Sequence, residues 1–169
     1  MVVDLEATST GSKAKIIQVG IVVIEDGEIV EQYATDVNPH ERLDSHIKEL
    51  TGLTDKRLAK APEFSQVAGK IFELVKDGIF VAHNVHFDAN LLAEFLFFEG
   101  YELRTPRIDT VELAQIFYPQ LEKYNLGILC QELGIPLEQA HSALSDAQAT
   151  AELFLCMRQK MFQLPKGLL

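Results

Sequence analysis

Residues 2–36 decide the fold, and they run VVDLEATSTGSKAKIIQVGIVVIEDGEIVEQYATD. Val2–Leu5 is short and mostly apolar, which indicates a strand that starts almost at the terminus. Ile16–Ile24 is an apolar run rich in β-branched residues, typical of a buried central strand. Asp26-Gly27 is a hairpin turn signal that leads into a third strand at Glu28–Asp36. The segment therefore predicts three antiparallel strands.

The remainder of the chain is mainly helical, with two further short strands predicted at Ile79–Ala82 and Arg107–Asp109. Apolar residues at helical spacing continue between and after these strands. This order predicts an α/β domain with a mixed sheet that occupies residues 1–164, and residues 165–169, which contain Pro165-Lys166-Gly167, are predicted to be a terminal linker. Helices are predicted at Leu43–Leu50, Asp55–Leu58, Phe64–Val75, Phe87–Phe98, Thr110–Phe117, Leu126–Leu133 and Ser145–Met161.

Composition narrows the class of protein. A chain of 169 residues suits one globular domain with a sizeable core. No apolar run approaches the roughly 20 residues of a membrane span, and the acids at Asp4 and Glu6 do not fit a secretory signal. Cys130 and Cys156 have no metal-binding spacing, so we interpret them as reduced thiols. These features predict a cytoplasmic protein with no membrane partner.

The net charge of −10 is unusual for a protein that acts on nucleic acid, because a basic surface normally supplies affinity for phosphate. The sequence contains no dense block of lysine and arginine. Two explanations are compatible with a nuclease. Bound metals would recruit phosphate to an acidic cluster, or a neighbouring domain or partner would hold the nucleic acid.

Carboxylates occur at positions that suggest a metal site. Asp4 and Glu6 are two residues apart on a predicted strand, so both side chains leave the same face and repel unless a cation lies between them. The alternative is a polar, solvent-facing edge strand. Asp88 falls in the first turn of a predicted helix, where by itself it would favour helix capping. His83 and His86 are individually typical of satisfied residues beside an apolar strand.

The last predicted helix adds another acid and a histidine. Asp146 begins this helix, and the small residues Ala147 and Ala151 would let it lie close to the sheet, near Asp4. His141 precedes Asp146 by a spacing that would turn it about 140° away on a continuous helix, so we expect it on the preceding loop. Histidine side chains are common general bases in enzymes, although His141 alone also fits a surface loop histidine.

Together these segments resemble the DnaQ-like family of 3′-to-5′ exonucleases, in its subgroup with four acids and a histidine (DEDDh). The resemblance includes polymerase III epsilon-type proofreading domains and the exonuclease domain of DinG-type proteins of Gram-positive bacteria. Two departures are visible: Gln18 stands where a glutamate is common, and Ser9-Thr10 replaces the usual glycine-containing turn. The matching stretches are Asp4-Leu5-Glu6-Ala7-Thr8, Ile16-Ile17-Gln18-Val19-Gly20, Leu50-Thr51-Gly52-Leu53-Thr54, His83-Asn84-Val85-His86-Phe87-Asp88 and the run from His141 to Asp146.

The resemblance implies a ribonuclease H-like fold, with a five-stranded mixed sheet of three antiparallel strands plus two parallel strands, flanked by helices. It implies that Asp4, Glu6 and Asp146 hold the metal that carries the nucleophilic water, with Asp4 bridging to a second metal that Asp88 helps to hold. His141 would take the proton from that water. The cofactors would be two divalent cations, Mg²⁺ or Mn²⁺, since oxygen ligands favour hard cations.

The resemblance also implies contacts with substrate. The backbone around Ala7 and Thr8 would meet the terminal 3′-hydroxyl, and Leu50 would wedge between the last bases. Asn84 and Phe87 would support the strand, or else only the second motif. Stacking and backbone contacts of this kind carry little sequence preference.

The leading hypothesis is a metal-dependent 3′-to-5′ exonuclease that degrades single-stranded DNA and releases nucleoside 5′-monophosphates, within a larger replication, repair or helicase-like polypeptide or assembly. An RNA 3′-exonuclease of the RNase T or oligoribonuclease type would use the same residues, and DNA is favoured over RNA. A non-catalytic binding module with a vestigial site is a further alternative. A small-molecule metallohydrolase is disfavoured, because neither a histidine-rich ligand set nor a phosphate-cradling glycine loop is present.

Overall fold

The computed structural model describes residues 1–163, so the predicted linker at 165–169 lies outside the described residues, as does the last residue of the predicted domain. A five-stranded sheet with the order β3-β2-β1-β4-β5 forms the centre of the fold. Antiparallel pairing joins β1 to β2 and β2 to β3, and parallel pairing joins β1 to β4 and β4 to β5, which confirms the predicted mixed sheet. The strands are β1 Val2–Ala7, β2 Ile16–Glu25, β3 Glu28–Asp36, β4 Phe80–Ala82 and β5 Arg107–Asp109.

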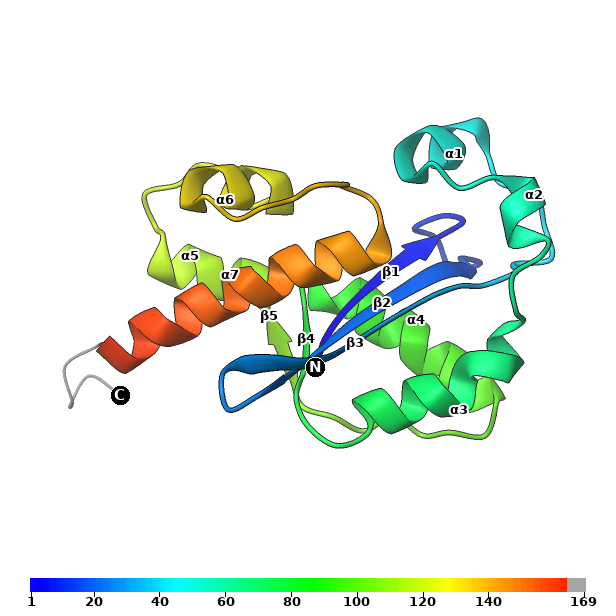
Figure 1. The fold of residues 1–169 in the computed structure, drawn as a ribbon, viewed down its shortest axis with the longest axis horizontal. Coiled ribbons are helices and arrows are strands. Elements are labelled where there is room, and N and C mark those ends of the chain that lie inside the picture. The colour runs from blue at the N-terminus through cyan, green and yellow to red at the C-terminus, as the bar shows by residue number, and fades with distance from the viewer. Residues whose placement is uncertain (164–169) are drawn as a thin grey trace.

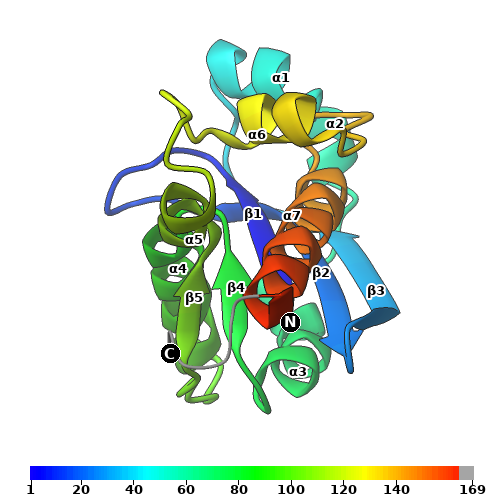
Figure 2. The same cartoon turned by 90° about the vertical axis from the view of Figure 1, so that its left-hand side faces the viewer.

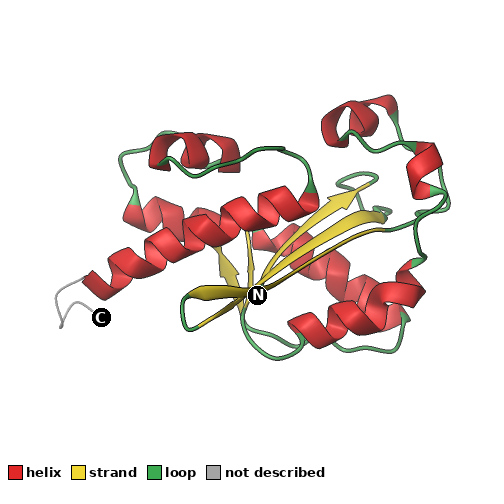
Figure 3. Cartoon of the chain, viewed as in Figure 1, coloured by secondary structure: helices red, strands yellow, loops and turns green. Residues whose placement is uncertain are grey.

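Helices cover both faces of the sheet (Figures 1 and 3). The long helix α7 crosses one face over β1 and β2, while α3 and α4 lie on the other (Figure 2). The short helices α1 and α2 form a lobe beyond the end of β1 (Figure 1). Within residues 1–163, every helix is too short or too polar to span a membrane. The helices are α1 Ser45–Thr51, α2 Asp55–Leu58, α3 Phe64–Val75, α4 Val85–Phe98, α5 Thr110–Phe117, α6 Leu126–Leu133 and α7 Ala143–Gln163.

Helices α4 and α7 begin two residues before their predicted starts, and in both cases contacts from distant segments explain the difference. The carboxylate of Asp109 accepts the backbone N–H groups of Asn84 and Val85, which fixes the first turn of α4. The side chain of Gln18 accepts the N–H of Ala143, the first residue of α7. Amphipathic periodicity cannot reveal such caps, because the partner is remote in sequence.

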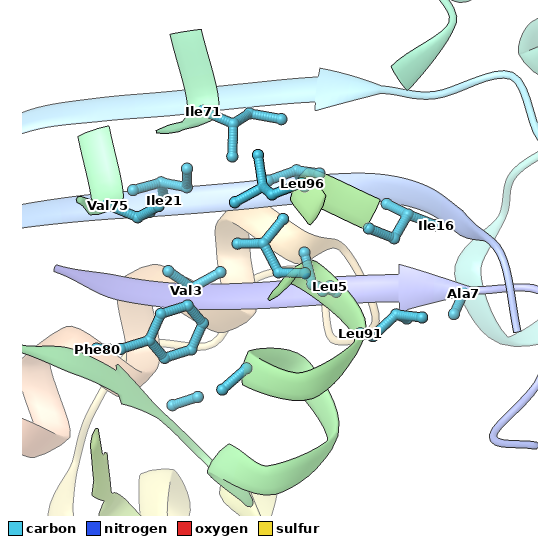
Figure 4. Packing of buried hydrophobic residues seen from close by; sticks show 14 of the residues in the cluster. Val3, Leu5, Ala7, Ile16, Ile21, Ile71, Val75, Phe80, Leu91 and Leu96 are labelled. Carbon is cyan, nitrogen blue, oxygen red and sulfur yellow. The ribbon is translucent and has the colours of Figure 1, made fainter. Parts of the chain in front are cut away.

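The core between the sheet and helices α3 and α4 takes one side of β1. Val3, Leu5 and Ala7 point to this side and are buried (Figure 4). Because strand side chains alternate, Asp4 and Glu6 leave the opposite side, toward α7. Apolar partners from the other elements of this cluster include Ile16, Ile21, Ile71, Val75, Phe80, Leu91 and Leu96 (Figure 4).

Small residues let α7 lie close to the other face of the sheet. Ala147 and Ala151 are fully buried against the sheet, as predicted. The closest approach occurs at Gly20 on β2, where an added Cβ would lie 2.3 Å from the carbonyl carbon and oxygen of Ala143. No side chain fits at that distance. Gly20 is the cross-strand partner of Asp4, so this contact brings the start of α7 next to the β1 carboxylates.

Replacing Gly20 with alanine should therefore push the first turn of α7 off the sheet. We expect Gly20→Ala to lower the free energy of unfolding by about 1–3 kcal/mol, the usual cost of overpacking. Urea unfolding followed by circular dichroism would measure the change. Gly11→Ala is the matched control, because its new Cβ would meet only the Ser9 Oγ at 3.9 Å. Equal stability of the two variants would contradict the proposed close approach.

Candidate active site

Asp4 and Glu6 lie on the central strand of the sheet, so the alternative that they belong to an edge strand is wrong. Both side chains are half-buried. Their cross-strand partners on β2 are Gly20 and Gln18, the two residues that contact the start of α7. The two carboxylates therefore occupy the narrow space between the middle of the sheet and the first turn of the long helix.

Asp88 approaches the same strand from the opposite side, in the first turn of α4. Its buried carboxylate reaches the neighbouring strand, where Oδ1 accepts the backbone N–H of Leu5 at 2.8 Å. This amide is available because the β1–β4 pairing is confined to Val2 and Val81, so no strand accepts it. This hydrogen bond holds Asp88 against β1 at Leu5, the residue between Asp4 and Glu6.

Asp109 supports this arrangement and was not singled out from the sequence. Its carboxylate accepts three backbone N–H groups, from Asn84 at 3.1 Å, Val85 at 3.2 Å and Val111 at 2.8 Å. The bond to Val111 caps α5, a role that an acid between a strand and a helix does suggest. The other two bonds fix the start of α4, which carries Asp88, and only the fold reveals them.

Asp146 and His141 come together at the start of α7, with His141 on the preceding loop as predicted. His141 is exposed and has a left-handed backbone (φ 61°), and its N–H donates to Asp146 Oδ2 at 3.0 Å. Ligand atoms of Glu6, His141 and Asp146 all lie within 4.8 Å of one another. This group of three suits a divalent cation.

The other carboxylate oxygen of Asp146 supplies an independent test of that fit. Asp146 Oδ1 is buried and accepts no hydrogen bond from the described residues 1–163. A buried polar atom without a partner is costly, because it has lost its water and gained nothing in return. A cation bound between Asp146 and Glu6 would satisfy this oxygen, so the residues present fit a metal site.

Burial raises the pKa of all four acids, and repulsion from neighbouring carboxylates adds to the shift at Asp4, Glu6 and Asp88. Burial raises the pKa of Asp4 well above its ordinary range, and the charges of Asp88, Asp146 and Glu6 raise it further. Burial, aided by the charge of Asp146, raises the pKa of Glu6 to about 7. Burial likewise raises the pKa of Asp88 to about 7, against the opposing bond from Leu5. Burial raises the pKa of Asp146, partly offset by the N–H of His141. A bound cation would relieve this repulsion.

A cavity of about 400 Å³ is lined by Glu6, the only one of the four acids that reaches it, and extends to α1. Four of the five predicted substrate contacts line it, namely Ala7, Thr8, Leu50 and Phe87. Asn84 does not; it is exposed, has a left-handed backbone (φ 71°) and precedes α4. The N–H of Thr8 already donates to the carbonyl of Lys15 at 2.9 Å, and its Oγ1 accepts the Lys15 N–H at 3.1 Å. A substrate hydroxyl cannot use that amide without breaking the first bond.

His83 and the two cysteines conform to their predicted structural roles. His83 bonds the hydroxyl of Thr110 and the carbonyl of Tyr124, both at 2.8 Å, and burial lowers the pKa of its imidazole. This confirms His83 as a satisfied residue beside an apolar strand. Cys130 and Cys156 are free thiols, as expected.

The raised pKa values predict how stability varies with pH in the absence of metal. The folded protein holds protons on Glu6 and Asp88 up to about pH 7, whereas ordinary values are 4.5 and 3.8. Between these limits the folded state therefore binds more protons than the unfolded chain. The contribution of these two acids to the free energy of unfolding is thus present at low pH and is lost as the pH rises through about 7. In EDTA we expect Tm to fall from about pH 5 to about pH 8.

Saturating Mn²⁺ should flatten this dependence, because the cation favours the ionised carboxylates. The double variant Glu6→Gln, Asp88→Asn should show a shallower slope in EDTA than the unmodified protein. A slope that is unchanged in the double variant would show that other groups govern the pH dependence.

The sequence is similar to those of known exonucleases and polymerases. The family described as Exonuclease matches residues 1–154. The chain is 38% identical over 168 residues to 3′-5′ exonuclease DinG of Bacillus subtilis (strain 168), covering 98% of this chain and 18% of that protein. It is 40% identical over 162 residues to DNA polymerase III PolC-type of Clostridium perfringens (strain 13 / Type A), covering 95% of this chain and 11% of that protein. The chain therefore spans less than two thirds of the length of these relatives.

Solved structures share the fold. The nuclease domain of 3′hExo, a DEDDh family member, bound to rAMP, has a TM-score of 0.81 at 20% identity, covering 97% of this chain and 93% of that one. E. coli Exonuclease I in complex with a dA16 oligonucleotide has a TM-score of 0.82 at 17% identity, covering 96% and 41%. These likenesses confirm the predicted ribonuclease H-like fold. The family match and the relatives together show that the chain belongs to the Exonuclease family.

Proposed function

We propose that this domain is a metal-dependent 3′-to-5′ exonuclease that removes nucleotides from the 3′ end of single-stranded DNA. The observation that carries the proposal is the buried Oδ1 of Asp146, which has no partner among residues 1–163 and lies beside Glu6 and His141. Water adds through its oxygen to phosphorus, and the bond from phosphorus to the 3′ oxygen of the preceding nucleotide breaks. That oxygen gains a proton and becomes the new 3′-hydroxyl, and the last nucleotide leaves as a 5′-monophosphate.

The four acids would hold the metal. Asp4, Glu6 and Asp146 would share one ion, and Asp4 would also contact a second ion together with Asp88. Two divalent cations, Mg²⁺ or Mn²⁺, supply charge neutralisation for the attacking and leaving oxygens at sites of this kind. The protein contributes fixed ligands, because Asp88 is bonded to β1 and Asp146 to the His141 backbone.

His141 would act as the general base. Its ring lies beside the carboxylates of Glu6 and Asp146, with ligand atoms within 4.8 Å, and it is exposed on a loop. The imidazole would take a proton from the attacking water, and the adjacent carboxylates would stabilise the resulting imidazolium. The bond from the His141 N–H to Asp146 holds the base and a metal ligand in one unit.

The cavity beside the carboxylates would receive the terminal nucleotide. Leu50, which is 37% exposed, and Phe87 provide apolar walls on which a base can pack. The backbone near Ala7 and Thr8 would meet the sugar, through groups other than the Thr8 amide. Asn84 would act indirectly, by starting the helix that carries Asp88. Contacts of this kind do not discriminate between bases.

The relatives support DNA as the substrate and a larger polypeptide as the setting. They are a 3′-5′ exonuclease and a DNA polymerase III, and the chain covers only 18% and 11% of their lengths. With a net charge of −10, the domain would bind the strand weakly on its own, and a neighbouring domain or partner would strengthen the binding. An RNA substrate remains the alternative, because the same five residues would serve it.

Digestion of a 5′-labelled single-stranded DNA oligonucleotide in Mn²⁺ tests the proposal. We expect a ladder that shortens from the 3′ end and is absent in EDTA and with Asp4→Ala. An RNA oligonucleotide of the same sequence should be degraded more slowly. Products shortened from the 5′ end, or cutting that persists with Asp4→Ala, would contradict the proposed activity. Faster degradation of the RNA than of the DNA would indicate that RNA is the substrate.

The base assignment predicts that His141→Ala lowers kcat by about 10²–10⁴-fold, the usual contribution of general-base catalysis. The matched control is His40→Ala, because His40 is also an exposed histidine with a left-handed backbone (φ 54° against 61° for His141). Steady-state rates on the same oligonucleotide would measure both. Full activity of His141→Ala, or an equal loss in the two variants, would refute the assignment.

A further inference from the structure

We propose that Gln18 is a positioning residue for this site: its side-chain amide sets where the segment from His141 to Asp146 lies relative to Glu6. The inference rests on the proposed function for what the positioned groups do, whereas the contacts that carry it are independent of the reaction. Gln18 neither lines the cavity nor belongs to the group of candidate ligands, so it would act through the residues that it holds.

Gln18 joins two segments that are remote in sequence. It is buried on β2, directly across from Glu6 in the β1–β2 pairing. Its Oε1 accepts the backbone N–H of Ala143 at 2.8 Å, and its Nε2 donates to Asp36 Oδ1 at 2.8 Å. Ala143 is the first residue of α7, where the N–H has no partner within the helix. The side chain thus caps α7 from the sheet.

The position requires an amide, because one atom must accept and the other must donate. A glutamate at position 18 could accept from Ala143, but its second oxygen would face the Asp36 carboxylate at hydrogen-bond distance and repel it. A leucine of similar size would leave the N–H of Ala143 buried and unpaired. Glutamine satisfies both neighbours without adding a charge opposite Glu6.

The network continues to the other wall of the cavity. Asp36 also accepts two bonds from the guanidinium of Arg57, one of them from Nη2 at 2.9 Å. Arg57 belongs to α2, in the lobe whose neighbouring helix α1 carries Leu50. Ala143, Gln18, Asp36 and Arg57 therefore connect the helix that bears Asp146 with the lobe that walls the cavity.

Gln18 and Gly20 have complementary effects on the start of α7. Gly20, across from Asp4, permits the close approach of the helix, while Gln18, across from Glu6, fixes one backbone group of its first turn. Without the Gln18 contact, the His141 to Asp146 segment would lose its anchor to the sheet. The unpartnered Asp146 Oδ1 would then no longer be held toward Glu6.

The test compares Gln18→Leu, Gln18→Glu and Asp36→Asn with the double variant Gln18→Glu, Asp36→Asn. In the double variant, the new amide at position 36 would donate to the new carboxylate at position 18, whose other oxygen would accept from Ala143, and the net charge is unchanged. We expect Gln18→Leu and Gln18→Glu to lower kcat and Mn²⁺ affinity about 10–100-fold, as for other residues that orient metal ligands. KM for the oligonucleotide should change little, and the double variant should recover most of both losses relative to Gln18→Glu.

Two readouts do not require activity. Amide hydrogen exchange of residues 141–146 in metal-free protein should accelerate in Gln18→Leu and Gln18→Glu and slow again in the double variant. The rise of Tm with added Mn²⁺ should be smaller in Gln18→Leu and Gln18→Glu than in the unmodified protein, and should be larger again in the double variant. If the unmodified protein proves inactive, the proposed function fails, but exchange and Mn²⁺ binding still decide the role of Gln18.

The inference would be overturned if Gln18→Leu changed neither the amide hydrogen exchange of residues 141–146 nor the affinity for Mn²⁺. A double variant that behaves like Gln18→Glu would also overturn it, because the role then depends on glutamine itself rather than on the donor and acceptor pattern. Each variant should also be assayed at the same temperature interval below its own metal-free Tm. If kcat of the variants then equals that of the unmodified protein, Gln18 has a purely structural role, and the inference is overturned.

Discussion

The close contact between the first turn of α7 and strand β2 governs the whole acidic end of the sheet. At Gly20 the helix backbone lies so near that any side chain would collide with Ala143. Because Gly20 pairs with Asp4 across the sheet, this contact determines how far Asp146 lies from the β1 carboxylates. The buried alanines of α7 extend the same close packing along the helix. Asp146 and His141 could not join Glu6 on a helix that packed at an ordinary distance through large side chains.

The clustering of acids at this end of the sheet lowers the stability of the folded protein. Burial raises the pKa of all four acids, and repulsion raises it further at Asp4, Glu6 and Asp88. The alternation of β1 provides the compensation, since Val3, Leu5 and Ala7 are buried on its other side against α3 and α4. A single strand thereby contributes to the apolar core and to the candidate metal site. The site exists because the hydrophobic cluster on the opposite face holds β1 in the middle of the sheet.

Local sequence patterns predicted the elements and placed Asp4 and Glu6 on one side of β1, whereas long-range contacts account for the remainder. Alternation on β1 and the Asp26-Gly27 turn, with positive φ at both residues, depend only on neighbouring residues. The Asp109 carboxylate that starts α4 and the Gln18 amide that caps α7 serve segments distant in sequence. Gln18 was visible as a departure from the family pattern, but its partners became evident only in the folded chain.

We propose that Asp146 Oδ1, Asp4 and Glu6 form one cation site. Anomalous diffraction from crystals soaked in Mn²⁺ tests this most directly, because it locates the ion without relying on turnover. We expect an anomalous peak within coordination distance of Asp146 Oδ1 and of both β1 carboxylates, and we expect this peak to be absent from Asp146→Ala crystals. Crystals of the unmodified protein with no peak at these oxygens, at saturating Mn²⁺ and a pH above 7, would contradict it.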